Sequence, residues 1–228
     1  MKMLAWLDKY VEDCRTFPGD ASLAYRLNGV RGLWDAVAQR TVDRIIGSGH
    51  VVIFAQTLDS APDVPPPPGV IIRLLSAADW PALSSIVTQR DLARFKALVA
   101  AGHRGLVAWR GSEPIGYGWV AERIGPDVTA CPLALPADAA YLWDLYVVPA
   151  ERSNGIGSAL ASARIRVARE AGFREGWRMI APSNTPSIRT LAKSGAATRV
   201  VGEFRFIKIL SRLHARFMPA AGAAGGIN

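Results

Sequence analysis

The stretch AYLWDLYVVPAERSNGIGSALASARIRVAREAG, residues 140–172, decides the fold of this protein. It opens with an apolar run that lacks the alternation of a half-buried strand, so it predicts a strand buried on both faces. A proline ends the run, two glycines separated by one residue follow, and an alanine-rich amphipathic segment predicts a helix over 155–171. We therefore expect a strand, a tight turn and a helix in immediate succession.

The glycine turn has the chemistry of an anion site. Gly155 and Gly157 give the backbone room and permit a positive φ. The first amides of the following helix lack carbonyl partners, and the helix dipole adds about half a positive charge there. This predicts a site for a phosphate or pyrophosphate, with Arg152 beside it and the Ser158 hydroxyl available. A plain helix cap with packing glycines is the alternative for an isolated R-x-x-G-x-G.

Two other phosphate-binding motifs are excluded. The dinucleotide fingerprint G-x-G-x-x-G needs a third glycine where this chain has Leu160. The P-loop needs a Gly-Lys-Ser/Thr ending, which does not occur. An anion site at this turn would therefore be of another kind.

The chain around this stretch alternates between strand and helix patterns. Residues 70–210 predict the order β α α β β β α β α β, which is typical of a mixed α/β sheet with helices on its faces. The predicted strands cover 70–75, 105–111, 115–123, 141–149, 176–182 and 197–210, the last with a break at Gly202, and the predicted helices cover 79–88, 91–102, 155–171 and 184–195.

A proline-rich stretch divides the chain. We expect a mostly helical extension over 1–59, an extended linker over 60–69, the main domain over 70–212 and a flexible tail over 213–228. Gly47 and Gly49 are expected to end a helix of the extension, and HVVIFAQTL to form a short strand after it. The extension should pack on the main domain, as structural padding, a lid on the acceptor site, a dimer surface or a docking face.

The bulk composition favours a soluble protein with an acidic ligand. The net charge is +8, and residues 69–228 carry all of this excess. No apolar run is long enough for a membrane span, and the acidic start is unlike a signal peptide. Cys14 and Cys131 show no framework or metal spacing, which favours a reducing, cytoplasmic setting. The histidines His50, His103 and His214 show no metal spacing either, so no metal is expected.

Two motifs in this order of elements resemble a known family. Val147-Val148-Pro149 followed by Arg152-Ser153-Asn154-Gly155-Ile156-Gly157 looks like the acyl-CoA pyrophosphate motif of the GNAT superfamily of N-acetyltransferases. Asn184-Thr185-Pro186-Ser187 resembles the second signature of that family, and the order of elements over about 70–210 is similar too.

The resemblance implies a GNAT-like fold and an acetyl-CoA donor. In this family the pantetheine arm lies in a gap between the fourth and fifth strands of the domain. Carried over, the implied CoA-binding residues are the pantetheine-facing backbone at Leu145, Tyr146 and Val147, the pyrophosphate loop Arg152, Ser153, Asn154, Gly155, Ile156, Gly157 and Ser158, and then Asn184 and Ser187. A helix N-cap is the alternative role of Asn184, and the two roles are compatible.

The sequence indicates the catalytic groups less clearly than the CoA-binding residues. Leu191 stands where this family frequently has a tyrosine that protonates the departing thiolate. Asp144 is the only carboxylate in its apolar strand, so burial should raise its pKa and suit a general base. Tyr141 stands where some relatives have a catalytic glutamate, and Glu122 is a third candidate. A structural hydrogen bond is the alternative role of Asp144, and a solvated strand end that of Glu122.

Three functions remain open from the sequence. The first is transfer of an acetyl group from acetyl-CoA to the primary amine of a small molecule. The second uses a longer acyl-CoA or an acyl carrier protein, and the third is a non-catalytic acyl-CoA-binding module. The acceptor site is expected to draw on Trp80, Arg90, Arg94, residues 124–139, Glu203 and Arg205. A homodimer is considered, whereas a nucleic-acid partner is not expected.

Overall fold

The computed structural model describes residues 18–34, 46–125, 128, 133–209 and 212–220. Its central feature is an eight-stranded sheet in the order β2-β3-β4-β5-β6-β1-β7-β8. Neighbouring strands are antiparallel except β5 and β6, which run parallel. Helices lie on both faces of this mixed sheet, which confirms the predicted α/β class.

The elements follow the order predicted for residues 70–210. The strands are β1 (Ile46–Thr57), β2 (Val70–Leu74), β3 (Arg104–Arg110), β4 (Glu113–Ala121), β5 (Ala139–Val147), β6 (Glu175–Ile180), β7 (Thr198–Ile209) and β8 (Arg212–Pro219). The helices are α2 (Trp80–Leu83), α3 (Gln89–Ala100), α4 (Ile156–Glu170) and α5 (Thr185–Ala192), with 3-10 turns η1 (Ala77–Asp79) and η2 (Pro149–Glu151). Residues 18–34 form a further helix.

Each face of the sheet has its own core. On the face of α2 and α3, Phe95 meets Tyr117 and Trp119 of β4 edge to face. On the other face, α4 packs through its apolar side over β2, β3, β4 and β5. Leu160 of α4 is fully buried there, and burial of one such side chain stabilises the fold by about 1.5–3 kcal/mol. The two helical layers therefore fix β4 and β5 from both sides.

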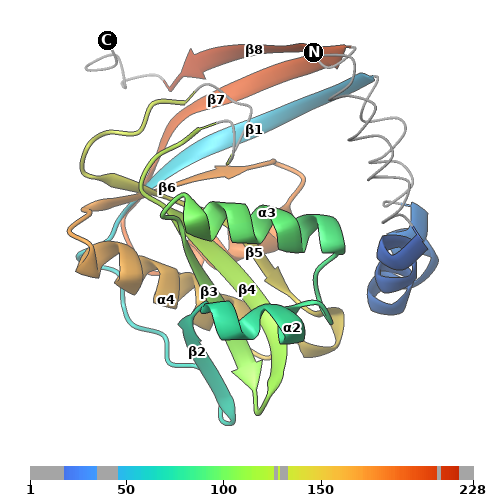
Figure 1. The fold of residues 1–228 in the computed structure, drawn as a ribbon. Coiled ribbons are helices and arrows are strands. Elements are labelled where there is room, and N and C mark those ends of the chain that lie inside the picture. Colours follow the sequence, from blue (N-terminus) through green and yellow to red (C-terminus); the bar gives the residue numbers. More distant parts are fainter. Residues whose placement is uncertain (1–17, 35–45, 126–127, 129–132, 210–211, 221–228) are drawn as a thin grey trace.

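The strand before the proline-rich stretch is not peripheral. β1 lies between β6 and β7, and Figure 1 shows it running beside β7 and β8 at one end of the sheet. The prediction that Gly47 and Gly49 end a helix is wrong, because both lie within β1. Gly49 has a packing reason to lack a side chain, since a Cβ there would collide with the ring of Phe206 on β7. The main sheet thus includes residues from before position 60.

The carboxyl-terminal part of the chain also differs from the expectation. Residues 213–219 of the predicted flexible tail lie in β8, which pairs with β7. In β8, basic residues alternate with apolar ones, and Phe217 packs against Phe204 with 5.1 Å between ring centroids. The predicted break in the preceding strand is absent, since β7 continues through Gly202. Residues 221–228 lie outside the described part of the chain.

The proline-rich stretch packs along α4. Its contacts are made by Gly155, Ser162 and Arg169, which are seven residues apart and so lie on one side of the helix. Pro67 lies against Gly155, with 3.6 Å from its Cγ to the position of an added Cβ. The amide of Val64 donates to the Ser162 hydroxyl at 2.9 Å. The stretch is therefore extended, as expected, but it is held against the helix over the length of four of its turns.

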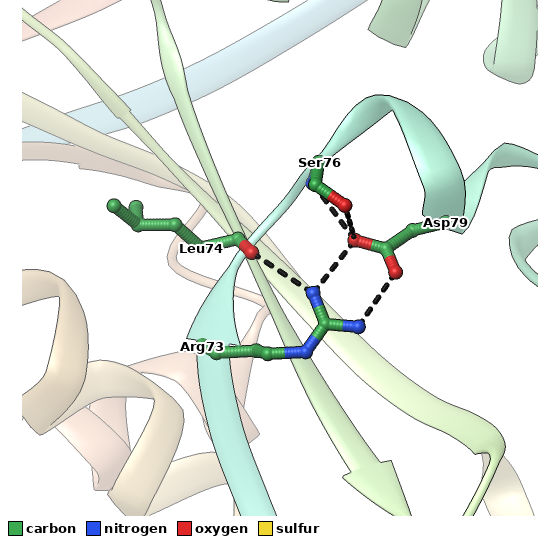
Figure 2. A network of polar contacts seen from close by, with 4 residues as sticks. All are labelled: Arg73, Leu74, Ser76 and Asp79. Carbon is green, nitrogen blue, oxygen red and sulfur yellow. Dashed lines mark hydrogen bonds and ion pairs between the residues drawn. The ribbon is translucent and has the colours of Figure 1, made fainter.

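A buried carboxylate joins β2 to the helical layer that follows it. Arg73 of β2 donates two hydrogen bonds to Asp79, at 2.6 and 2.7 Å, as Figure 2 shows. The amide and hydroxyl of Ser76 donate to the same carboxylate. These donors, with Arg73 the largest contributor, lower the pKa of Asp79 far below its ordinary value. The network fixes the entry into α2.

Candidate active site

β5 and β6 separate along their length. They pair only from Ala139 with Glu175 to Tyr141 with Trp177. Beyond that point β5 continues to Val147 beside β4, whereas β6 continues to Ile180 beside β1. The β6-facing edge of β5 is therefore left without a strand partner over residues 142–147. This is the gap that the sequence analysis expected between these two strands.

A β-bulge lies on β5 where the strands diverge. Tyr146 pairs with Tyr117 and Trp143 with Trp119, so Gly118 alone faces both Asp144 and Leu145. Asp144 has a φ of 47°, a left-handed conformation that is unusual for a residue with a side chain. A bulge re-aims side chains and backbone groups locally. It turns Asp144 out of the regular alternation of the strand.

The turn after β5 has the geometry of an anion nest. Ser153 and Gly155 have φ values of 66° and 82°, and successive turns of this kind point backbone amides into one concavity. The first helical hydrogen bond runs from the Ala159 amide to the Gly155 carbonyl, so the amides of residues 156–158 precede it. Residues 152–155 are exposed and Gly157 and Ser158 are half-buried, so the turn lies at the surface of the protein.

Arg152 connects this turn to β5. Its Nε donates to the Val147 carbonyl at 3.0 Å, and its guanidinium lies 5.9 Å from the centre of the Tyr146 ring. The side chain is therefore anchored at the end of the strand, with its charge next to the nest. The carboxylate of Glu151, which also borders the turn, is held by two hydrogen bonds from Arg110. Its negative charge is thus compensated beside the anion site.

The second motif caps a short helix. Asn184 is the N-cap of α5, and its side chain accepts a hydrogen bond from the Ser187 amide at 3.2 Å. Asn184 is exposed and Ser187 is half-buried. The capping role named in the sequence analysis is therefore present, and the exposed Asn184 amide group keeps further hydrogen-bonding capacity.

Asp144 lies near a positively charged side chain of α3. Its Oδ2 is 3.9 Å from Nη1 of Arg94, whose guanidinium also lies 4.8 Å from the centre of the Trp143 ring. Burial raises the pKa of Asp144 above its ordinary value, and the positive charge of Arg94 offsets part of that rise. The direction agrees with the expectation for this strand. The Asp144 carboxylate is 29% exposed, so solvent reaches it.

Three tyrosines surround the diverging strands. Tyr141 belongs to the last pair of β5 with β6, is buried, and stacks with Trp143. Tyr146 and Tyr117 stack with 5.4 Å between ring centroids. Burial raises the pKa of both, and the charge of Asp144 adds to the rise at Tyr117. The Tyr146 hydroxyl is buried and has no hydrogen-bond partner among the described residues.

The other predicted residues take various places. Leu191 is 5% exposed in the core under α5, and Glu122 is held by Arg104 at 2.8 Å on the surface. Trp80 packs partly buried on the core of the α3 face. Arg205 pairs with Glu203 on β7, and β6 and β1 lie between β7 and β5 in the sheet.

Two buried residues beside the gap were not named in the sequence analysis. Arg164 of α4 and Arg178 of β6 are both buried, and Arg164 donates to the Trp143 carbonyl of β5. Their burial has no clear signal in the sequence, because Arg166 and Arg169 of the same helix are similarly spaced basic residues that reach the surface. The orientation of α4 on the sheet decides that Arg164 is buried while Arg166 and Arg169 reach the surface.

The described residues contain no group of three His, Cys, Asp or Glu side chains that could hold a metal ion. Within the same part of the chain, every helix is too short or too polar to cross a membrane. Cys14 and Cys131 lie outside the described residues.

Known proteins share both the sequence pattern and the fold. A family model described as the acetyltransferase (GNAT) family matches residues 71–196. A Drosophila protein of known structure is similar over 81% of this chain and 68% of its own, with a TM-score of 0.55 and 17% identity. A fungal multi-domain β-N-acetylglucosaminidase, described as having a GCN5-related glucosamine N-acetyltransferase region, is similar over 75% of this chain and 22% of its own, with a TM-score of 0.51 and 10% identity. At these identities the two structures show a shared fold, and a search of curated proteins finds no match.

Proposed function

Because the chain belongs to the GNAT family of acetyltransferases, we propose that it transfers an acyl group, in the simplest case acetyl from acetyl-CoA, to the primary amine of a small molecule. The observation that carries this proposal is the juxtaposition of two features. The free amides at the start of α4 follow directly after the strand that separates from β6. A long acidic thioester could use both at once.

The donor would be held mainly by backbone. Its diphosphate would accept hydrogen bonds from the amides of Ile156, Gly157 and Ser158, with Arg152 adding charge. Hydrogen bonds to a charged group contribute about 1.5–3 kcal/mol each. The pantetheine arm would follow the open edge of β5 at residues 145–147, and Asn184 would face it from α5. These residues fit the group because their polar atoms are exposed or lack strand partners.

The reaction would be direct attack of the amine nitrogen on the thioester carbonyl carbon. An amine with a pKa of about 10.4 is mostly protonated at pH 7, which disfavours its neutral form by about 4.6 kcal/mol. Asp144 would accept the proton, through water, because its pKa is raised and its carboxylate is partly exposed. Tyr141 is the second candidate for this role, and its burial at the base of the gap makes it less accessible.

Two further groups would complete the chemistry. An amide at Tyr146 or Val147 would stabilise the oxyanion that forms on the thioester oxygen. The Tyr146 hydroxyl would then protonate the departing thiolate, in place of the tyrosine that Leu191 replaces. Its burial without a partner supports this role, since a ligand would supply the missing hydrogen bond.

A longer acyl donor, whether a CoA thioester or an acyl carrier protein, is the second candidate, and the buried Arg164 and Arg178 beside the gap favour it. A module that binds acyl-CoA without turnover is the third. A homodimer and a role for residues 1–59 in acceptor binding stay proposals.

The test is release of free thiol from acetyl-CoA in the presence of a panel of primary amines, alongside calorimetric binding of CoA. We expect micromolar CoA binding and amine-dependent thiol release. Binding without release for any amine would favour the non-catalytic module. Absence of CoA binding by the folded protein would overturn the proposed function.

A further inference from the structure

Two guanidinium groups are buried where β5 and β6 part. Arg164 is 3% exposed and Arg178 is 5% exposed. Arg178 is the first residue of β6 beyond its last pair with β5. Arg178 lies on the same face of β6 as Gly176, where an added Cβ would touch Leu142 in the core under α4, so both arginines lie on that face.

Arg164 reaches the bulge of β5 from α4. Its Nη1 donates to the Trp143 carbonyl at 2.9 Å, and its Cδ would lie 2.9 Å from a Cβ on Gly118, the residue opposite the bulge. The missing side chain of Gly118 therefore leaves the space through which Arg164 approaches the sheet. The charge of Arg178 acts on Arg164, so the two guanidinium groups lie near each other, and Arg164 contacts β5 one residue before the bulge.

The pair lacks the partners that buried charges require. Nε of Arg164 and both Nε and Nη2 of Arg178 are buried without a hydrogen-bond partner in the described residues, and no ion pair to either arginine occurs there. Burial lowers the pKa of Arg178 to about 10, and burial together with the charge of Arg178 lowers that of Arg164. The charge of Asp144 acts favourably on Arg164, but that carboxylate also lies against Arg94.

Burying two guanidinium groups without partners costs free energy unless an anion binds to them. The diphosphate is not that anion, because Arg164 lies eight residues beyond Ile156, about 12 Å along the helix. The Asp144 carboxylate is fixed on the strand beside Arg94. A carboxylate carried in by a substrate would match two guanidinium groups with three unpartnered donor nitrogens, since it accepts several hydrogen bonds at once.

We propose that Arg164 and Arg178 bind the terminal carboxylate of the acyl group, so that the preferred donor is a CoA thioester of a short dicarboxylic acid. This inference rests on the proposed acyl transfer and names its donor class. The transfer of the dicarboxylic acyl group follows the same steps as the transfer of acetyl. The amine nitrogen forms a bond with the thioester carbonyl carbon, the carbon–sulfur bond breaks, the amine proton goes to Asp144, and the thiolate takes a proton from the Tyr146 hydroxyl, which solvent reprotonates, to give free CoA. The product amide keeps the carboxylate.

The test compares donors that differ only in this group. Calorimetry would measure the Kd of malonyl-CoA against propionyl-CoA and of succinyl-CoA against butyryl-CoA, with acetyl-CoA as reference. We expect the carboxylated member of at least one pair to bind at least tenfold more tightly. Equal binding within each pair, with acetyl-CoA bound, would overturn this inference and leave the proposed function standing. Failure of every CoA thioester to bind would instead overturn the proposed function.

Single substitutions test whether Arg178 causes the tighter binding of carboxylated donors. Arg178→Met should reduce the ratio within each pair to about one and leave the Kd of the neutral donors unchanged. Arg166→Met, on the exposed side of the same α4 helix as Arg164, is the matched control and should keep the wild-type ratio. Arg178→Met should also raise the melting temperature, because it removes an unpaired buried charge. Should it fail to fold, Arg178→Lys, which keeps the charge but loses the planar donors, should lower the ratio instead. A wild-type ratio in the folded variant contradicts the assignment.

The other possible source of a carboxylate that binds the two arginines is the acceptor. With acetyl-CoA as donor, thiol release would be compared for 5-aminovalerate and butylamine in the wild type and in Arg178→Met. We expect no preference that depends on Arg178. A preference for 5-aminovalerate that the variant abolishes, with no preference among donors, would assign the arginines to the acceptor and overturn the donor class.

Discussion

The substitution Gly157→Asp places a negative charge at the proposed diphosphate site without straining the fold. Unlike Gly155, Gly157 does not have a positive φ, and an added Cβ would meet only Val147, at 3.9 Å. Asp near a helix N-terminus interacts favourably with the dipole by about 0.3–1 kcal/mol. The protein should therefore remain folded, with an equal or slightly higher melting temperature.

The effect on binding follows from Coulomb's law. A carboxylate about 6 Å from one phosphate charge, at an effective dielectric of about 20, costs about 2.8 kcal/mol. That energy corresponds to an increase of about 100-fold in the Kd for CoA. The neutral control Gly157→Asn adds nearly the same volume and should weaken binding about fivefold or less. Calorimetric titration with CoA measures both, and circular dichroism melts check the fold. A Kd for the folded Asp variant within threefold of wild type would refute a diphosphate at this helix.

Three further substitutions test the groups around the site. Asp144→Asn should lower kcat by about 10²–10⁴-fold at neutral pH if this carboxylate is the base. Because the pKa of Asp144 is raised in the folded protein, the folded state binds its proton more tightly than the unfolded chain, so the free energy of unfolding falls as pH rises above the ordinary pKa of aspartate; urea denaturation across pH 4–7 should show a smaller fall in the variant, and an unchanged pH dependence would count against the raised pKa. Leu191→Tyr, which introduces the tyrosine frequent in the family, should destabilise by about 1–3 kcal/mol because Leu191 is buried, and should not raise kcat; a faster enzyme would show that position 191 reaches the leaving group. Asp79→Asn should cost about 1–3 kcal/mol by weakening the contact with Arg73; because the pKa of Asp79 is lowered, its contribution is complete above about pH 5 and is lost as pH falls further, so melts of wild type and variant should converge in acid, and a constant difference would contradict this assignment.

The elements around the anion site were predictable because their signals are local. The unbroken apolar run before Pro149 predicts a strand buried on both faces, and β5 is covered by a core on each side. The glycines after it predict the left-handed turn, which the structure places at Gly155. The loop chemistry and the start of α4 follow from neighbouring residues alone.

The structure differs from the sequence-based predictions where contacts between segments far apart in the chain decide the local conformation. Position 49 is a strand residue because Phe206, more than 150 residues later, packs over it. β8 forms because β7 provides a partner for its alternating pattern. The burial of Arg164 and Arg178 depends on how α4 and β6 meet at the bulge, which no local pattern in either segment records.

A crystal structure of the protein with acetyl-CoA would test the proposed donor site most directly. We predict density for the diphosphate within hydrogen-bonding distance of the amides of Ile156, Gly157 and Ser158, and for the pantetheine arm along the open edge of β5 between residues 142 and 147. Density for the nucleotide elsewhere on the molecule, with the space between β5 and β6 filled by the protein's own side chains, would contradict it.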